Sequence, residues 1–461
     1  MKFWLRSAIA LILVVLAVVF RPDRALHVAS GLTAQLLCSA TFVSGLEPEK
    51  AFAETVRPMA SVAGPLLRYA VDRNEKSVSA SILGLLPSKA VYHAGYGCRL
   101  EYAESRAVPP PLSQTAPPAE LPTVETVNPE LRAILDRAFA EQNGPPPRNI
   151  KAIVIVKDGR IVAERYAAGY GPETPLPSFS VAKSITNALV GILVRQGKLK
   201  VEAPAPIAAW HGAGDPRAAI TLDNLIRMDS GLALEESDSG FDPVSRMLYL
   251  EDDMAAFAEA GQVGVTPGTA WDYTSANTLI ISAIIRDAIG GGQADYLRFA
   301  RDELFAAAGM RNVTMEFDGA GTQVSSTSIF APARDWARFG ELFLNDGVAA
   351  TGTRVLPEGW VAYSKHSTLG STYGAGFWTN DGPSEFAADR IAAGMPADAF
   401  FASGNLGQRI YIVPSEHLVV VRFGVTHRPP DFDIVGDLHL LRDTIAALKK
   451  NAPSTSDGIP L

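Results

Sequence analysis

The chain has 461 residues, of which 47% are hydrophobic and 20% charged, and its formal net charge is -8. This composition predicts a globular protein large enough for two domains or for one large two-lobed domain. The acidic balance argues against nucleic acid as a partner. The seven histidines and two cysteines do not fall at metal-ligand spacings, so no metal site is predicted.

The chain begins with an apolar run that is typical of an export signal. Lys2 and Arg6 precede this run at 7–20, and Arg21 follows it. Its length suits the central region of a signal peptide, because a full membrane span needs about 20 apolar residues. No small-x-small cleavage site follows closely, so an uncleaved membrane anchor over residues 1–24 is the preferred interpretation. The bulk of the protein would then lie in the cell envelope, outside the cytoplasm.

Residues 25–105 are expected to form an accessory segment. Its predicted elements are a helix at 34–43 and strands at 77–83 and 90–102. Both cysteines of the chain, Cys38 and Cys98, lie in this segment. In an exported protein such a pair most economically forms one disulfide, which would stabilise the fold by about 3 to 5 kcal/mol. Two buried free thiols are the alternative.

A proline-rich stretch at 106–124 predicts an extended linker. The main domain is expected at 125–450, and a polar tail at 451–461 is expected to be disordered. The domain starts with a predicted helix at 129–142 and two strands joined by Asp158-Gly159, a dipeptide that favours a tight hairpin. Antiparallel strands at this place argue against the parallel α/β-hydrolase plan, and the Gly-x-Ser-x-Gly motif of that plan is not present.

A helix is predicted to begin at Ser180. Apolar residues recur downstream at helical spacing, and Gly197 is a natural stop. Ser180 would lie at the positive end of the helix dipole, with Lys183 one turn later on the same face. A lysine in a dry pocket has a depressed pKa and can take the proton of a serine. Ser180 and Lys183 are therefore candidates for a nucleophile and its base, and a chance pairing is the alternative for so short a pattern.

Two later stretches carry side chains that could line a pocket. Tyr273, Ser275 and Asn277 follow a Pro-Gly turn at alternate positions, which point the same way in extended chain. Taken alone, the stretch favours a turn followed by a helix cap over a shared pocket wall. In the β-rich C-terminal part, Ser403-Gly404-Asn405 marks a break at which strand backbone can come close to a ligand.

The order of these motifs resembles the serine β-lactamase/penicillin-binding-protein superfamily. The motifs are Ser-x-x-Lys at Ser180 and Lys183, Tyr-x-Ser at Tyr273 and Ser275, and the Gly-bearing strand at 403–404. Over roughly residues 130–450, the chain is most similar to the class C β-lactamase-related hydrolases and esterases, especially the 6-aminohexanoate-dimer hydrolase branch. The resemblance implies an α+β fold: an antiparallel sheet flanked by helices, a helical lobe, and the serine helix between them.

The resemblance also implies a reaction that needs no cofactor. Ser180 would attack a carbonyl and become acylated, and Lys183 would accept its proton. Tyr273, given phenolate character by Lys183, would pass the proton to the leaving group. Which of Lys183 and Tyr273 is the base stays open, as it does for other Ser-x-x-Lys enzymes. The backbone N–H groups of Ser180 and Asn405 would form the oxyanion hole. The residues expected to border the substrate are Ser275, Asn277, Ser403, Gly404 and Asn405.

Two departures from the family pattern bear on the substrate. Relatives usually carry a cation on the Gly-bearing strand, where this chain has Ala402, and many carry Asn where it has Ser275. A methyl group cannot pair with a carboxylate, so penicillins and D-Ala-D-Ala ends are disfavoured as substrates. Arg409 or Arg422 could supply the missing charge from a neighbouring position.

Three hypotheses follow. The leading one is an exported serine hydrolase of small-molecule esters or small amides, held at the membrane by its N-terminal segment. The enzymatic rival is a β-lactamase or D,D-peptidase. A non-catalytic receptor or scaffold with the same fold is the third, although nothing in a scaffold requires Ser180, Lys183 and Tyr273.

Overall fold

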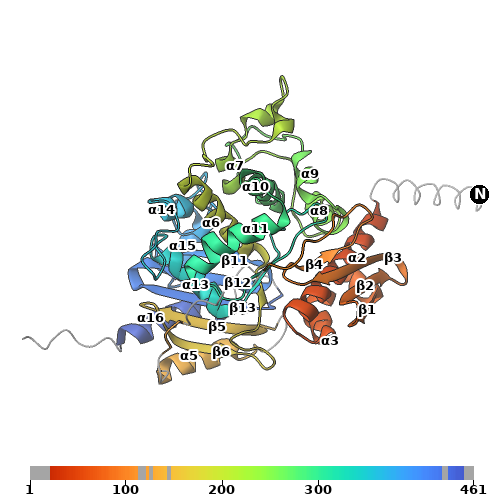
Figure 1. Ribbon diagram of the computed structural model, residues 1–461. Helices are drawn as coiled ribbons and strands as arrows, with labels where there is room; N and C mark the ends of the chain where they lie inside the picture. Colours follow the sequence, from red (N-terminus) through yellow and green to blue (C-terminus); the bar gives the residue numbers. More distant parts are fainter. Residues whose placement is uncertain (1–20, 113–120, 124–127, 143–146, 428–434, 451–461) are drawn as a thin grey trace, which may run out of the picture. The chain divides into compact units, whose positions relative to one another are not determined.

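The structure, a computed structural model, describes residues 21–112, 121–123, 128–142, 147–427 and 435–450 (Figure 1). The apolar run at 7–20, the polar tail at 451–461 and part of the proline-rich stretch lie outside the described residues. The chain divides into two compact units. The first is Met1–Ala116, Pro177–Leu304 and Val313–Phe330, and the second is Pro117–Leu176, Phe305–Asn312 and Ala331–Leu461.

The N-terminal segment, residues 21–112, is a four-stranded antiparallel sheet covered by one long helix. The strands pair in chain order: β1 (Leu67–Asp72), β2 (Ser77–Ile82), β3 (Leu85–His93) and β4 (Gly97–Leu100). Helix α2 (Pro22–Cys38), continued by η1 (Ser39–Val43), packs against β2 and β3 and is longer than predicted. The short helices of the segment are α3 (Pro48–Ala51), η2 (Phe52–Val56), α4 (Arg57–Met59) and η3 (Ser61–Leu66).

A disulfide joins the end of α2 to β4. It links Cys38 and Cys98, which are both fully buried and 60 residues apart in the sequence. Closing a loop of this length is worth about 4 kcal/mol on the chain-entropy model. Apolar residues of α2 and the strands pack around the disulfide, so it lies in the core of the N-terminal segment.

Among the described residues, one helical stretch is long and apolar enough to cross a membrane. It is Pro22–Val43, with 22 residues and a mean hydropathy of 1.3. More than half of this stretch is buried inside the protein. A buried helix that covers a sheet has the same composition, so α2 and η1 are explained as a core element of the N-terminal segment.

The rest of the first unit is a helical lobe. Its helices are η4 (Phe179–Val181), α6 (Ala182–Arg195), η5 (Ala208–Trp210), η6 (Pro216–Ala219), α7 (Leu222–Arg227), α8 (Pro243–Leu250), α9 (Met254–Glu259), α10 (Ser275–Ala288), α11 (Gln293–Phe299) and η7 (Ala300–Phe305). Its short strands are β7 (Leu176–Pro177), β8 (Thr314–Met315) and β9 (Ile329–Ala331). Helices α6 and α10 pack against each other and are buried over most of their length, because apolar residues surround both of them.

The second unit is built on a six-stranded antiparallel sheet in the order β10-β11-β12-β13-β5-β6. The strands are β5 (Ile150–Lys157), β6 (Arg160–Tyr166), β10 (Trp378–Thr379), β11 (Phe400–Gly404), β12 (Gln408–Val413) and β13 (Leu418–Gly424). The hairpin predicted from Asp158-Gly159 joins β5 to β6, and both of these residues have positive φ. A tight turn of this kind requires positive φ at both of its central positions, which explains why Asp and Gly occupy them.

Helices cover both faces of this sheet. Those that pack on its faces include α5 (Pro129–Phe139), α13 (Ala333–Leu344) and α16 (Leu440–Lys450). The unit also contains α12 (Ala306–Ala308), α14 (Trp360–Lys365), α15 (Glu385–Ala392), η8 (Asn405–Gly407), η9 (Pro414–Glu416) and η10 (Val435–His439). Leu418 and Val420 of β13 pack with α5 and α16, whereas Val419 and Phe423 face Gly340 and Trp336 of α13. The alternation of a strand thus gives one helical layer to each face.

Candidate active site

The serine helix begins with a strained turn. Ser180 lies in η4, and the α-helix starts only at Ala182, so the predicted helix start is displaced by this turn. Phe179 has a φ of 43°, in the left-handed region. For a bulky residue this costs about 1 to 3 kcal/mol, and such outliers cluster at functional sites. Ser178 holds the turn, since its hydroxyl donates to the carbonyl of Thr327 at 2.9 Å.

Lys183 lies one turn after Ser180 and points its amine at the serine hydroxyl. Its Nζ donates to Oγ of Ser180 and to Oγ of Ser275, each at 3.0 Å, and to the carbonyl of Ser326 at 3.3 Å. Lys183 is 3% exposed, whereas Ser180 is partly exposed. A carbonyl compound can therefore reach the hydroxyl while the amine stays shielded from water.

The hydrogen-bond partners of Lys183 determine where the lone pair of a neutral amine points. The carbonyl of Ser326 can only accept, so it takes one N–H. Ser275 donates its single hydroxyl proton to Oε1 of Glu236 at 3.0 Å, and so it also accepts from Lys183. Both N–H groups of the neutral amine are then used, which leaves its lone pair for the hydroxyl of Ser180. The cluster aims Lys183 at Ser180 as a base.

The charge state of Lys183 agrees with this geometry. Burial lowers the pKa of Lys183 to about 8, while the carboxylates of Glu236 and Asp238 act in the opposite direction. With a pKa of about 8, roughly a tenth of the molecules carry a neutral lysine at pH 7. A neutral amine is therefore present in part of the molecules near neutral pH.

Tyr273 lies beside the same amine. Nζ of Lys183 is 4.7 Å from the centre of the Tyr273 ring. Burial raises the pKa of Tyr273 well above its usual value, the Glu236 carboxylate adds to this rise, and a hydrogen bond with Ser180 opposes it. The expected phenolate character is therefore wrong for the resting site, because the buried phenol holds its proton. A neutral phenol next to Ser180 is suited to relaying a proton.

The expectation that Tyr273, Ser275 and Asn277 share one extended wall is wrong. Helix α10 begins at Ser275, and Thr274 caps it by accepting from the N–H of Ala276. Asn277 lies in the first turn and is fully buried, and its Oδ1 accepts from Ser230 at 2.9 Å. The helix-cap alternative thus describes this stretch, and Asn277 holds α10 to the loop after α7.

Ser403, Gly404 and Asn405 lie in the second unit, where the end of β11 passes into η8. Leu406 interrupts this turn with a φ of 60°. The N–H of Leu406 donates to Oδ1 of Asn405 at 2.8 Å, and the carbonyl of Gly404 accepts from Arg409 at 3.0 Å. The break expected in this strand is thus present as a left-handed turn.

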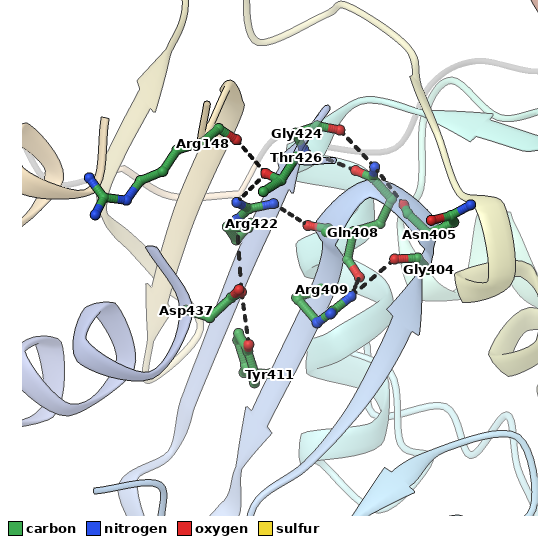
Figure 2. A network of polar contacts seen from close by, with 11 residues as sticks. Arg148, Gly404, Asn405, Gln408, Arg409, Tyr411, Arg422, Gly424, Thr426 and Asp437 are labelled. Atoms are coloured by element: carbon green, nitrogen blue, oxygen red, sulfur yellow. Dashed lines mark hydrogen bonds and ion pairs between the residues drawn. The ribbon is translucent and has the colours of Figure 1, made fainter. Parts of the chain in front are cut away.

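Both arginines that could supply the missing cation make hydrogen bonds inside the sheet (Figure 2). Arg409 donates to the carbonyls of Gly404 and Gln408, at 3.0 and 2.9 Å. Arg422 is fully buried and lies 3.8 Å from the Asp437 carboxylate, which accepts from the Tyr411 hydroxyl at 3.0 Å. Arg422 therefore serves the core of the sheet, and its charge is not available to a substrate.

Sequence reasoning missed two members of the cluster. Glu236 precedes Ser275 by 39 residues and accepts from both its hydroxyl and its backbone N–H. Ser326 lies in a run of hydroxyl residues that looks like an ordinary loop in the sequence. No spacing rule connects these residues to Lys183, because the fold brings them together. Within the described residues, no three His, Cys, Asp or Glu side chains are grouped as metal ligands.

Comparison with known proteins defines the class. A family model described as Beta-lactamase matches residues 150–443, which is more than half of the chain. The chain therefore belongs to the beta-lactamase family of serine hydrolases, and the expected α+β fold of that superfamily is confirmed.

Three similar proteins are informative. The 6-aminohexanoate-dimer hydrolase of Paenarthrobacter ureafaciens is 25% identical over 265 residues, which cover 54% of this chain and 63% of that protein. A Bacillus anthracis structure assigned to the 6-aminohexanoate-dimer hydrolases is similar with a TM-score of 0.57 and 21% identity, covering 72% of this chain and 88% of that one. A family VIII carboxylesterase gives a TM-score of 0.54 at 17% identity, with coverages of 70% and 98%. The chain thus spans less than two thirds of the curated relative, and the two structures show the fold alone.

Proposed function

We propose that the protein hydrolyses esters or small amides through an acyl-enzyme on Ser180. One observation carries this proposal: Lys183 is buried, has a pKa lowered to about 8, and directs its amine at the Ser180 hydroxyl at 3.0 Å. A serine becomes a useful nucleophile only when a base takes its proton. The hydroxyl and carbonyl acceptors around Lys183 leave its lone pair for that proton.

The proposed reaction has two halves. Oγ of Ser180 attacks the carbonyl carbon as its proton moves to Nζ of Lys183, which gives a tetrahedral intermediate and an ammonium. The ammonium returns a proton through the Tyr273 hydroxyl to the leaving alcohol or amine, and the C–O or C–N bond breaks. Water then attacks the acyl ester with the same base, which releases the acid and restores Ser180. The backbone N–H of Ser180 is proposed as one donor of the oxyanion hole, and Ser275 as part of the border of the substrate site.

The substrate class is proposed from the missing cation. Ala402 replaces the cation usual in the family, and Arg422 pairs with Asp437 in the core of the sheet. A substrate without a carboxylate at this place is therefore favoured over penicillins or peptide termini. The relatives named above are a 6-aminohexanoate-dimer hydrolase and a carboxylesterase, in keeping with amide and ester substrates.

The location of the protein is also a proposal. The apolar run at 7–20 is typical of an export signal or anchor, and the Cys38–Cys98 disulfide suits an oxidising compartment. We infer that the catalytic part works outside the cytoplasm, in the cell envelope.

Parallel assays with p-nitrophenyl acetate or butyrate and with nitrocefin test the proposed function. We expect ester turnover that is lost in Ser180→Ala and kept in Ser415→Ala, a matched change in an exposed turn. Ester turnover that persists in Ser180→Ala would show that the nucleophile is wrong. Nitrocefin turnover as fast as that of the esters would favour the β-lactamase rival, and no turnover of either would favour a receptor or scaffold.

A further inference from the structure

Five of the nine large apolar side chains that stay exposed among the described residues gather in one region of the first unit. They are Val62, Leu66, Leu83, Leu85 and Phe241, with exposures between 38% and 90%. The N–H of Leu83 donates to the carbonyl of Leu66 at 3.1 Å, and Leu85 pairs with Ile82 in the next strand. Leu66, Leu83 and Leu85 therefore lie together at one end of the sheet β1–β3. An exposed apolar cluster of this kind marks an interaction surface.

This apolar tip lies at the end of the sheet that packs beside the first turns of helix α2. The small core beneath it consists of Ala29, Ala63, Leu67 and Ile82, with Leu26 packed against it. Next to Phe241, Gly240 lies against α2, because a Cβ added at Gly240 would be 3.7 Å from Cβ of Ala25. The end of the sheet and the loop before α8 thus both lie beside the first turns of the same helix.

The sequence before α2 indicates what covers this tip. The apolar run ends at Phe20, and α2 begins at Pro22. If the run at 7–20 enters a bilayer, the first turn of α2 must lie at the bilayer surface, because α2 begins only two residues after the run ends. The apolar tip lies beside the first turns of α2 and would be carried to the surface with them.

Exposed arginines border the tip. Arg24 lies in the first turns of α2, and Arg57 precedes η3. A Cβ at Gly64 would lie 2.6 Å from the carbonyl of Arg57, which places Arg57 against the segment that carries Val62. The guanidinium of Arg68 donates to the carbonyls beside the tip, at 2.9 and 3.3 Å. An apolar surface with a basic border fits the boundary between lipid headgroups and acyl chains.

We propose that this tip is a second membrane contact, which enters the headgroup–acyl boundary of the bilayer that holds the N-terminal run. Its side chains are Val62, Leu66, Leu83, Leu85 and Phe241, and the arginines contact lipid phosphates. The contact fixes the orientation of the first unit at the membrane, which a single anchor segment alone leaves free. It does not depend on the reaction proposed for Ser180.

Tryptophan quenching in the full-length protein tests this contact. The chain is reconstituted into phosphatidylcholine vesicles with or without brominated acyl chains, and each variant is compared with the parent, which has six tryptophans. Leu85→Trp and Leu83→Trp place a probe in the tip. Asn74→Trp is the matched control, because Asn74 is exposed in the turn at the far end of β1, about 20 Å along the strand.

Brominated lipid should remove most of the fluorescence added by Leu85→Trp and Leu83→Trp and little of that added by Asn74→Trp. Two tip positions are read independently, so that one badly folded variant does not decide the result. Equal quenching at the tip and at Asn74→Trp, or none at either tip position, would overturn the proposal. A tip covered by a second copy of the chain would also overturn the proposal. The fluorescence of the added tryptophan would then resist quenching by both brominated lipid and acrylamide.

Discussion

Two buried cations of this chain have opposite surroundings. Arg422 is fully buried in the sheet, where it donates to the carbonyl of Gly407 and the hydroxyl of Thr426, both at 2.6 Å, and lies 3.8 Å from the Asp437 carboxylate. The acceptors of Lys183 in the helical lobe are two hydroxyls and a carbonyl oxygen. Desolvation therefore works against the charge of Lys183, whereas a carboxylate compensates that of Arg422.

The difference bears on the role that each of these buried side chains can have. A guanidinium keeps its charge at any ordinary pH, so Arg422 can only bind and stabilise. An amine can lose its proton when its charge is poorly compensated, so Lys183 can act as a base. Under the proposed function, burial thus goes with a structural role for Arg422 in the sheet and a reactive role for Lys183 in the helical lobe.

The largest effect is expected from removing the reactive nitrogen. Lys183→Met should lower kcat/KM for p-nitrophenyl esters by about 10²- to 10⁴-fold, because the general base is lost. Its melting temperature should be unchanged or higher, since a poorly compensated buried charge is removed. Lys198→Met, the same change at an exposed position, should leave both quantities unchanged. A strongly destabilised Lys183→Met would mean that the lysine is structural.

The reverse pattern is expected in the sheet. Arg422→Met should lower the free energy of unfolding by about 3 to 5 kcal/mol, because it leaves the buried Asp437 carboxylate without the positive charge beside it. Denaturant titration measures this loss, with Arg160→Met as the exposed control. Folded Arg422→Met should retain ester turnover. A stable Arg422→Met that has lost turnover would contradict the contrast between the two cations.

The carboxyl group of Glu316 is a third buried ionisable group, and it extends the comparison of Arg422 and Lys183. Glu316 is 1% exposed and accepts from Gln35 at 2.9 Å, Ser39 at 2.6 Å and the N–H of Cys98 at 2.9 Å. Burial raises the pKa of Glu316 from 4.5 to about 7, and these three hydrogen bonds oppose the rise. The folded state therefore holds this proton more tightly than the unfolded chain does.

The stability contributed by this proton is fully present below pH 4.5 and is lost as the pH rises through about 7. The expected loss over that range is about 3 kcal/mol. Burial also raises the pKa of Asp318 and of Glu341 to about 7, so these carboxyls contribute to the pH dependence as well. Glu316→Gln should therefore remove only the share that belongs to Glu316, whereas Glu101→Gln, at an exposed position, should leave the slope of the parent unchanged. A slope in Glu316→Gln as steep as that of the parent would contradict the raised pKa of Glu316.

The smallest effect concerns tuning of the base. The Glu236 carboxylate raises the pKa of Lys183, so Glu236→Gln should lower that pKa. The acidic limb of kcat/KM against pH should then move to lower pH, with a loss of about tenfold or less at the optimum. Glu235→Gln, an exposed neighbour, is the control. An acidic limb that moves to higher pH would contradict the role assigned to Glu236.

Much of the fold could be predicted because local sequence features, such as turn residues and apolar spacing, determine it. Asp158-Gly159 required the turn that joins β5 to β6, and the apolar spacing after Ser180 required a buried helix. Strand β1 was not predicted, since its alternation is short and weakly apolar. The extended wall through Asn277 failed because Thr274 offered a helix cap, and the cap governs the backbone that follows.

The candidate site could be predicted only where its members share an element or a motif. Ser180 and Lys183 are one helical turn apart, so spacing alone joins them. Glu236 is connected to Lys183 through its hydrogen bond with Ser275, and the carbonyl of Ser326 accepts directly from Lys183. Both are tertiary contacts, which no local sequence pattern encodes. The neutral state of Tyr273 likewise depends on burial, which exists only after folding.

The central claim is that Lys183 activates Ser180. The most direct test is mass spectrometry of the protein after reaction with a fluorophosphonate at several pH values. We expect a single adduct on the peptide that contains Ser180, formed faster as the pH rises through about 8 and not formed in Lys183→Met. An adduct on another serine, or labelling of Ser180 at an unchanged rate in Lys183→Met, would contradict it.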